Sequence, residues 1–304
     1  MTTTINPTTW LSHPDLSAAA GCDLILASET AQHTGSFKFR AAYHVAANVP
    51  HDRLITASSG NFGQALAYAA RLLGKACHVV MPTTSAQVKI AAVASHGAEV
   101  DLIDTRTVSR ADRVRALAAR HPDAYVASPY DDDLVIAGNA SLGHEIAERT
   151  DLTAVIAPIG GGGLASGIVS GLRDLGRTLP VWGAEPLLAN DAARSLRAGT
   201  LIANGQEPQT IADGARTISL GRRNWAILQP GLADIVEVPE AAIRAAVALL
   251  YTALGLVVEP TGALSLAALL TEPERLQGQR VCAVVSGANV DPDVHAALLT
   301  ATPL

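Results

Sequence analysis

The stretch that decides the fold is AVIAPIGGGGLASGIVSGLRDLG, residues 154–176. The apolar run over 154–159 has the length of a buried strand, and the segment after the glycines has the composition of a helix. Between them stand four consecutive glycines, Gly160–Gly163. Residues without a Cβ let backbone N–H groups close on a ligand, and the start of the next helix adds partial positive charge. The stretch therefore predicts a strand, a phosphate-binding loop and a helix in succession.

Short apolar runs alternate with helical segments along the rest of the chain. Such alternation is typical of βαβ units and of mostly parallel sheets. We expect strands at residues 23–27, 54–57, 77–81, 100–103, 124–127, 154–159, 181–184, 234–238 and 281–285. Because the sequence has no internal repeat and no long linker, a second lobe would be an insertion within the first.

The composition excludes several classes of protein. The 304 residues are 49% hydrophobic and 16% charged, which rules out a disordered chain. A net charge of −6 argues against nucleic acid or an anionic membrane surface as a partner. The longest apolar stretch, 245–258, is shorter than a membrane-spanning helix, and the start lacks the features of a signal peptide. The scattered cysteines Cys22, Cys77 and Cys282 fit a reducing compartment, so we expect a cytoplasmic protein.

Polar or glycine-rich clusters follow four of the expected strands. These clusters are SSGN at 58–61, GGGG at 160–163, AEP at 184–186 and SGAN at 286–289, and TGSFKFR at 34–40 opens the first long helix. Ligands of open α/β sheets bind outside the carboxyl ends of the strands. We therefore expect these clusters to meet at one site.

Lys38 has an unusual setting for a lysine. Phe37 and Phe39 flank it, and Thr34 and Ser36 can cap the helix that it opens. A lysine desolvated near a helix N-terminus has a lowered pKa and can act as a nucleophilic amine. A phosphate-binding loop and an activated lysine are the minimum equipment for pyridoxal phosphate held as a Schiff base.

These residues alone are also compatible with two other classes of protein. Gly160, Gly162 and Ala165 satisfy a permissive dinucleotide pattern, and Glu185 follows the next strand, so a nicotinamide oxidoreductase is one alternative. Its motif would stand in mid-chain, whereas this pattern normally occupies the first βα turn. A non-catalytic ligand-binding protein is the other alternative. A nucleotide triphosphatase is disfavoured because no Lys-Ser/Thr pair ends the glycine loop.

Seven motifs in chain order resemble one enzyme family. They are TGSFKFRAA, SSGNFGQALAYAA, VIAGNASLGHEI, PIGGGGLASGI, TIADGARTISLG, VEPTGALSLAAL and VVSGANVD, and the resemblance runs from about residue 24 to residue 291. With them the chain resembles the fold-type II pyridoxal-phosphate enzymes, and most of all their serine/threonine dehydratase and serine racemase branch. The resemblance implies an α/β, tryptophan synthase β-like fold with two open, mostly parallel sheets wrapped by helices. It also implies a large domain of residues 1–52 and 133–304, an inserted substrate-side domain of residues 53–132, and a homodimer.

The resemblance implies a role for each motif that meets the cofactor. Lys38 forms the Schiff base and acts as the base at the substrate Cα. Ser286 meets the pyridine nitrogen, and a neutral hydroxyl there leaves the ring a weaker electron sink, which favours β-elimination. The implied cofactor-binding set is Phe37, Lys38, Asn61, Gly160, Gly161, Gly162, Gly163, Glu259 and Ser286.

The implied substrate side departs from the family at two positions. Ser58, Ser59 and Asn61 would bind the substrate carboxylate, and in the racemases the residue at Ser59 is also the acid/base on the opposite face of Cα. Phe62 stands where the branch usually carries histidine. Tyr130 stands where dehydratases tend to have phenylalanine and racemases asparagine. Both aromatic residues would line the substrate side, so a β-hydroxy amino acid larger than serine is possible.

The segment EPLLAND resembles the divalent-cation site of the family. The implied ligands are the carboxylates of Glu185 and Asp191 and the carbonyl of Ala189. Ligation by oxygen alone suits Mg²⁺ or Ca²⁺.

The resemblance predicts a pyridoxal-phosphate-dependent lyase. Its expected reaction is the dehydration and deamination of an L-β-hydroxy amino acid such as serine or threonine to a 2-oxo acid and ammonia. Open alternatives are an amino-acid racemase on the same scaffold and an ammonia-lyase for hydroxyaspartate or a bulkier β-hydroxy amino acid. β-Replacement is less favoured because S-F-K-F-R differs from the S-x-K-D-R of the synthases.

Overall fold

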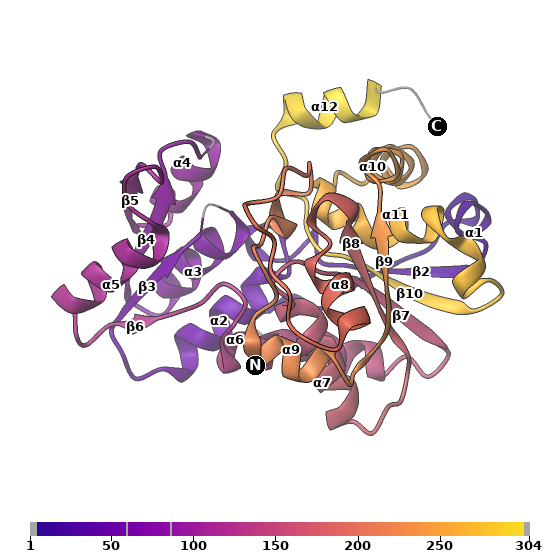
Figure 1. Cartoon of the computed structure of the whole chain (residues 1–304), viewed down its shortest axis with the longest axis horizontal. Coiled ribbons are helices and arrows are strands. Elements are labelled where there is room, and N and C mark those ends of the chain that lie inside the picture. The colour runs from indigo at the N-terminus through magenta and orange to yellow at the C-terminus, as the bar shows by residue number, and fades with distance from the viewer. Residues whose placement is uncertain (1–4, 59, 86, 301–304) are drawn as a thin grey trace.

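Two sheets organise the chain, and both are described in a computed structural model that covers residues 5–58, 60–85 and 87–300 (Figure 1). The larger sheet has six strands in the order β1-β2-β10-β7-β8-β9. All neighbouring pairs are parallel except β1 with β2, which is antiparallel. Its strands are β1 (Thr9–Leu11), β2 (Asp23–Ser28), β7 (Ala154–Pro158), β8 (Val181–Pro186), β9 (Leu232–Val238) and β10 (Arg280–Val285).

The smaller sheet has four parallel strands in the order β5-β4-β3-β6. They are β3 (Arg53–Ala57), β4 (Ala76–Pro82), β5 (Glu99–Ile103) and β6 (Tyr125–Val126). Figure 1 shows this sheet beside the larger one, with its own helices around it. All four strands fall within residues 53–132, the range expected for the inserted domain, and the domain limits themselves stay a prediction.

The nine expected strands are all present, and the fold class is confirmed. The sequence does not predict β1, which has three residues, and β6 is shorter than expected. The helices are α1 (Pro14–Ala20), α2 (Lys38–Asn48), α3 (Asn61–Leu72), α4 (Gln87–Ser95), α5 (Arg110–Arg120), α6 (Asp133–Ala147), α7 (Gly163–Asp174), α8 (Asp191–Ala198), α9 (Arg222–Leu228), α10 (Glu240–Leu254), α11 (Leu264–Thr271) and α12 (Pro292–Thr300). None of the helices in the described part of the chain is long and apolar enough to cross a bilayer.

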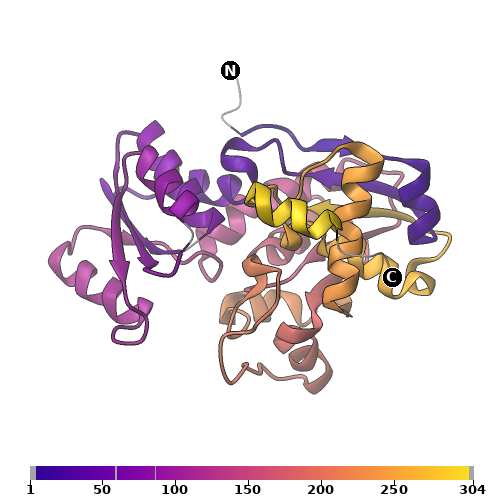
Figure 2. The same cartoon turned by 90° about the horizontal axis from the view of Figure 1, so that it is seen from above.

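Helices cover both faces of the larger sheet because its strands are apolar on both sides. Along β10, Val281 and Val285 belong to one core cluster with α10 and α11, whereas Cys282 and Val284 belong to another with α6 and α7. This split follows the two-residue period of a strand. Viewed from above, Figure 2 shows α10 in orange and α12 in yellow on the near side of the molecule.

Helix α2 links the two sheets and places Lys38 at their junction. It follows β2 of the larger sheet, but its apolar face, including Phe39 and Val45, packs in one core cluster with Leu54 and Met81 of the smaller sheet. Its other neighbour is α6, where Gly138 lets the helices approach closely, since a Cβ there would lie 2.7 Å from the Cα of Ala41. Lys38, the first residue of α2, therefore lies next to the space between the two sheets.

Candidate active site

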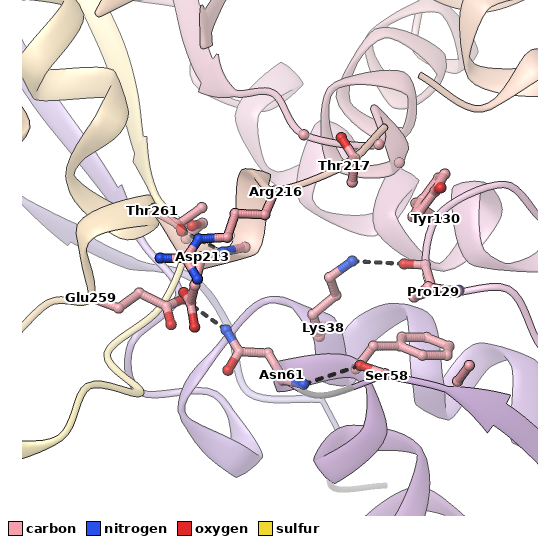
Figure 3. Close-up of a pocket in the computed structure, with 18 of the residues that line it drawn as sticks. Lys38, Ser58, Asn61, Pro129, Tyr130, Asp213, Arg216, Thr217, Glu259 and Thr261 are labelled. Carbon is pink, nitrogen blue, oxygen red and sulfur yellow. Dashed lines mark hydrogen bonds between the residues drawn. The ribbon is translucent and has the colours of Figure 1, made fainter. Parts of the chain in front are cut away.

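A cavity of about 460 Å³ lies where the carboxyl ends of strands from both sheets meet (Figure 3). Its volume falls in the range typical of small-molecule and cofactor sites. The segments after β2, β3, β7 and β10 all contribute to its lining, as the positions of the polar clusters predict. The expected residues that line it are Phe37, Lys38, Ser58, Asn61, Phe62, Tyr130, Gly160, Gly161, Gly162, Gly163, Glu259 and Ser286.

Lys38 is the central side chain of this cavity. Its Nζ donates a hydrogen bond of 2.7 Å to the carbonyl of Pro129, and it lies 5.0 Å from the ring centre of Phe37 and 5.7 Å from that of Phe62. Burial disfavours the charged ammonium and lowers the pKa of Lys38 to about 8, although the negative charge of Glu259 acts in the opposite direction. Roughly a tenth of the amine is therefore unprotonated at pH 7, far more than for an ordinary lysine.

The glycine loop has the form of a phosphate-binding cradle. In the described part of the chain, the N–H groups of Gly160, Gly161 and Gly162 donate to no protein acceptor, and α7 begins at Gly163. Gly162 has a φ of +92°, which favours glycine. The ring of Tyr130 covers Gly161, where a Cβ would lie 2.2 Å from the Tyr130 Cγ. Free N–H groups at a helix start fit a phosphate group.

Asn61 belongs to a hydrogen-bonded chain across the site. Its Nδ2 donates to Oε1 of Glu259 at 2.7 Å, and its Oδ1 accepts from Nδ2 of Asn289 at 2.8 Å. Burial raises the pKa of Glu259 to about 8, and the negative charge of Asp213 adds to this effect. Asn289 belongs to the SGAN motif, but the sequence alone predicts no role for this residue, because only the fold brings Asn289 next to Asn61.

Sequence reasoning also misses a group of charged residues around the cavity. They are Lys89, Arg110, Glu207, Asp213 and Arg216, and Thr217 and Thr261 accompany them. The motif TIADGARTISLG contains three of these seven residues and VEPTGALSLAAL contains Thr261, so these two motifs are the signals that could have found part of the group. Ser59, which is expected to be a substrate and acid/base residue, lies outside the described residues.

Glu185 and Asp191 lie near each other but do not line this cavity. Both carboxylate oxygens of Glu185 accept backbone hydrogen bonds of 2.9 Å, from Ala192 and Ala193 at the start of α8. Asp191 accepts from the Leu220 N–H at 3.0 Å and from the Asn204 side chain at 2.8 Å.

Burial raises the pKa of both carboxyl groups, to about 7 for Asp191 and well above its usual value for Glu185. The charge of Asp191 further raises the pKa of Glu185. Neither forms an ion pair with a basic side chain in residues 5–300 as described. Two buried carboxylates without a basic partner are oxygen donors of the kind that a divalent cation prefers.

The fold and the cavity together define a class of protein: an α/β enzyme with a site for a phosphate-bearing cofactor that reacts with a buried amine. The match to known proteins gives the family. Residues 1–287 match the pyridoxal-phosphate dependent enzyme family, and the chain belongs to it.

Several characterised relatives share most of their length with this chain. The L-threo-3-hydroxyaspartate ammonia-lyase of a Pseudomonas species is 37% identical over 93% of this chain and 90% of that protein. The serine racemase of Mus musculus is 34% identical over 94% and 87% of the two chains. Among solved structures, the T.th. threonine deaminase is 41% identical with a TM-score of 0.87, covering 94% of each chain.

The residues present fit pyridoxal phosphate. The cradle of free N–H groups suits its phosphate, the Lys38 amine suits its carbonyl carbon, and the buried Ser286 stands at the end of β10 as a neutral partner for its ring nitrogen. The cofactor expected from the sequence is thus confirmed by the family and matches the site.

Proposed function

We propose that this protein is a pyridoxal-phosphate-dependent lyase that converts an L-β-hydroxy amino acid to a 2-oxo acid and ammonia. The observation that carries the proposal is Lys38, a buried amine with a pKa of about 8 beside the glycine cradle. The names of the relatives, which include hydroxyaspartate ammonia-lyase and threonine deaminase, support a β-elimination. Ser286 supports it as well, because a hydroxyl leaves the ring nitrogen uncharged.

The side chains of the cavity divide the work of this reaction. Pyridoxal phosphate, when bound, supplies an electron sink for negative charge at the substrate Cα. The Gly160–Gly163 loop would hold its phosphate, and Asn61 would bond its 3′-oxygen. Lys38 takes the proton from Cα, which its lowered pKa permits at neutral pH. Phe37 and Phe62 exclude water from the amine.

The substrate carboxylate binds at the loop that follows β3. Ser58 and Asn61 line the cavity there, and Gly60 N–H donates to the Ser58 hydroxyl at 3.4 Å, which orients that side chain. This arrangement holds the amino acid with its Cα toward Lys38.

Replacement of Lys38 tests the proposal. Lys38→Ala should remove the absorbance band of lysine-bound pyridoxal phosphate and lower 2-oxo acid formation from L-serine, L-threonine and L-threo-3-hydroxyaspartate by at least about 10²–10⁴-fold, the usual contribution of a general base. Lys75→Ala is the matched control, because Lys75 donates to the Val49 carbonyl and does not line the cavity. Unchanged turnover in Lys38→Ala would overturn the assignment.

A racemase on the same scaffold is the second candidate. Serine racemases at 32–34% identity and an aspartate racemase structure at 30% identity support it. Ser59 would supply the proton on the opposite face of Cα. Chiral analysis of the amino acid that remains after partial turnover distinguishes the candidates, since a lyase leaves its enantiomer unchanged and a racemase produces both.

We also propose that Glu185, the Ala189 carbonyl and Asp191 hold Mg²⁺ or Ca²⁺. The support is that two buried carboxyl groups lie near each other with no basic side chain paired to either, and a bound cation would favour the ionised forms that burial disfavours.

We also propose that the protein is a homodimer and that it is located in the cytoplasm. The buried, unpaired thiols of Cys22, Cys77 and Cys282, whose pKa values burial raises to about 11 to 12, are compatible with a reducing compartment. Exposed apolar side chains on the larger unit, such as Tyr251 and Val294, support association with a second copy. Light scattering of the purified protein would report its mass.

A further inference from the structure

The charged residues around the cavity are unevenly paired. The cationic side chains of its lining are Lys38, Lys89, Arg110 and Arg216, and the acidic ones are Glu207, Asp213 and Glu259. A substrate that enters this cavity meets these groups, so the charge that stays unmatched determines which side chains the cavity accepts.

Two of the cations are already matched by carboxylates. Lys89 pairs with Asp213, and Arg110 Nη2 lies 3.2 Å from Oε2 of Glu207. Both pairs join the smaller sheet's helices to the 207–216 segment of the larger unit.

Lys38 is proposed to react with the cofactor, so Arg216 is the remaining cation of the cavity lining. Its Nε donates to the Thr210 carbonyl at 2.7 Å, and its two Nη groups have no carboxylate within ion-pair distance among the residues that the structure describes. Arg216 is thus the unmatched cation of the described cavity.

The backbone holds Arg216 in place. The turn that precedes it, Asp213–Ala215, is fixed by a hydrogen bond of 2.9 Å from Gly214 N–H to the Thr261 hydroxyl. Thr210, which accepts from Arg216, is itself held by its hydroxyl, 2.5 Å from Oε1 of Glu240. The guanidinium therefore needs little reorganisation to bind a ligand.

The turn before Arg216 packs against the phosphate cradle, since a Cβ at Gly160 would lie 2.8 Å from the Gly214 carbonyl oxygen, but the Arg216 side chain points away from the cradle. Figure 3 shows its side chain directed toward Thr261 and Glu259, at the opposite end of the cavity from Tyr130. Tyr130 is the residue whose ring covers Gly161 of the cradle. Glu259 is hydrogen-bonded to Asn61, a residue of the loop after β3 that is proposed to hold the substrate α-carboxylate, so Arg216 points toward that loop.

We propose that Arg216 binds a second carboxylate on the substrate side chain and so selects β-hydroxy dicarboxylic amino acids. This inference rests on the proposed function and names its substrate class. The α-carboxylate occupies the Ser58 and Asn61 loop, and the distal carboxylate forms charge-assisted hydrogen bonds with the free Nη groups. The planar fork of arginine matches a carboxylate in a way that the hydroxymethyl of serine or the methyl of threonine cannot.

Steady-state kinetics of the holoenzyme test the proposal. Arg216→Gln should lower kcat/KM for L-threo-3-hydroxyaspartate by roughly 10²-fold, the size expected for loss of charge-assisted hydrogen bonds, mainly through KM. The kcat/KM values for L-serine and L-threonine should stay within about threefold, and the cofactor absorbance should not change. Arg222→Gln is the matched control, since Arg222 is an exposed residue of α9 that does not line the cavity. Equal losses on all three substrates, or a wild-type preference for serine or threonine, would overturn the assignment.

A binding measurement separates failure of this inference from failure of the proposed function. Calorimetry with succinate and with butyrate, which differ by one carboxylate, should give a clear preference for succinate in the wild type and in Arg222→Gln but not in Arg216→Gln. If no amino acid yields a 2-oxo acid while this preference holds, the lyase function is wrong and the role of Arg216 stands. If the wild type binds both acids equally, the role of Arg216 is wrong whatever the turnover.

Discussion

Replacement of Gly161 with alanine measures how tightly Tyr130 and the phosphate cradle fit together. A Cβ at Gly161 would lie 2.2 Å from Cγ, 2.3 Å from Cδ2 and 2.6 Å from Cδ1 of Tyr130. Non-bonded carbons pack at about 3.5–4.0 Å, so the ring or the loop must move by roughly 1.3–1.8 Å. The carbonyl of Tyr130 is fixed by Asn224 Nδ2 at 2.9 Å, which opposes a shift of the backbone.

Such overpacking costs about 1–3 kcal/mol. If the cradle takes the strain, the Kd for pyridoxal phosphate rises by roughly 5- to 150-fold, because each 1.4 kcal/mol is a factor of ten. The assay is titration of the apoprotein with the cofactor, followed by absorbance. Gly205→Ala is the matched control, since a Cβ there meets nothing within 4 Å.

The same substitution in a Tyr130→Ala background identifies the cause. Without the ring, the added methyl has space, and Gly161→Ala should then change the Kd by less than about threefold, as expected for coupled neighbours. Wild-type affinity in the single variant would refute the reasoning. So would an equal loss in both backgrounds, because the clash with Tyr130 would then not be its source.

Three further predictions follow from buried charges. The Lys38 pKa is lowered to about 8, and only the free amine attacks the cofactor. The rate at which the apoprotein reacts with pyridoxal phosphate, followed by stopped-flow absorbance, should therefore fall tenfold per pH unit below about pH 8. A break in this pH profile near 10.4, the ordinary lysine pKa, would contradict the prediction. Arg40 is fully buried, and its Nε lies 2.6 Å from Oε2 of Glu29. Arg40→Met should therefore lower the free energy of unfolding, measured by urea denaturation, by about 3–5 kcal/mol, because it leaves the Glu29 carboxylate buried without its partner. The double variant Arg40→Met with Glu29→Leu should recover part of this loss. Added Mg²⁺ should raise the Tm of the wild type but not of Asp191→Asn; equal shifts in both would exclude the proposed cation site.

The sequence predicts those parts of the fold that have a local signature. Buried parallel strands such as β7 and β10 are continuous apolar runs, and the glycines after β7 mark a loop whatever its neighbours. β1 escapes prediction because three residues cannot show a period, and its antiparallel pairing with β2 depends on the sheet edge. The order β2-β10-β7 joins strands far apart in the sequence, and no local pattern encodes it.

The candidate site also contains residues that the sequence predicts and residues that it does not predict. Lys38, Asn61, Ser286 and the glycine loop belong to compact motifs, and the fold brings them to one cavity. The sequence does not predict the pair of Lys89 with Asp213, because the two residues are separated by 124 positions and Lys89 lies in none of the quoted motifs. For Glu185 the sequence predicts a metal ligand, and the structure adds a second role, since its carboxylate caps the start of α8.

The most direct test of the central claim is to locate the cofactor on the chain. Borohydride reduction of the purified holoenzyme, followed by digestion and mass spectrometry, would identify the lysine that carries pyridoxal phosphate. We expect the modification on Lys38 alone among Lys38, Lys75 and Lys89, the three lysines of the sequence. Modification of Lys75 or Lys89 in place of Lys38, or no modification of a holoenzyme that retains its absorbance, would contradict this expectation.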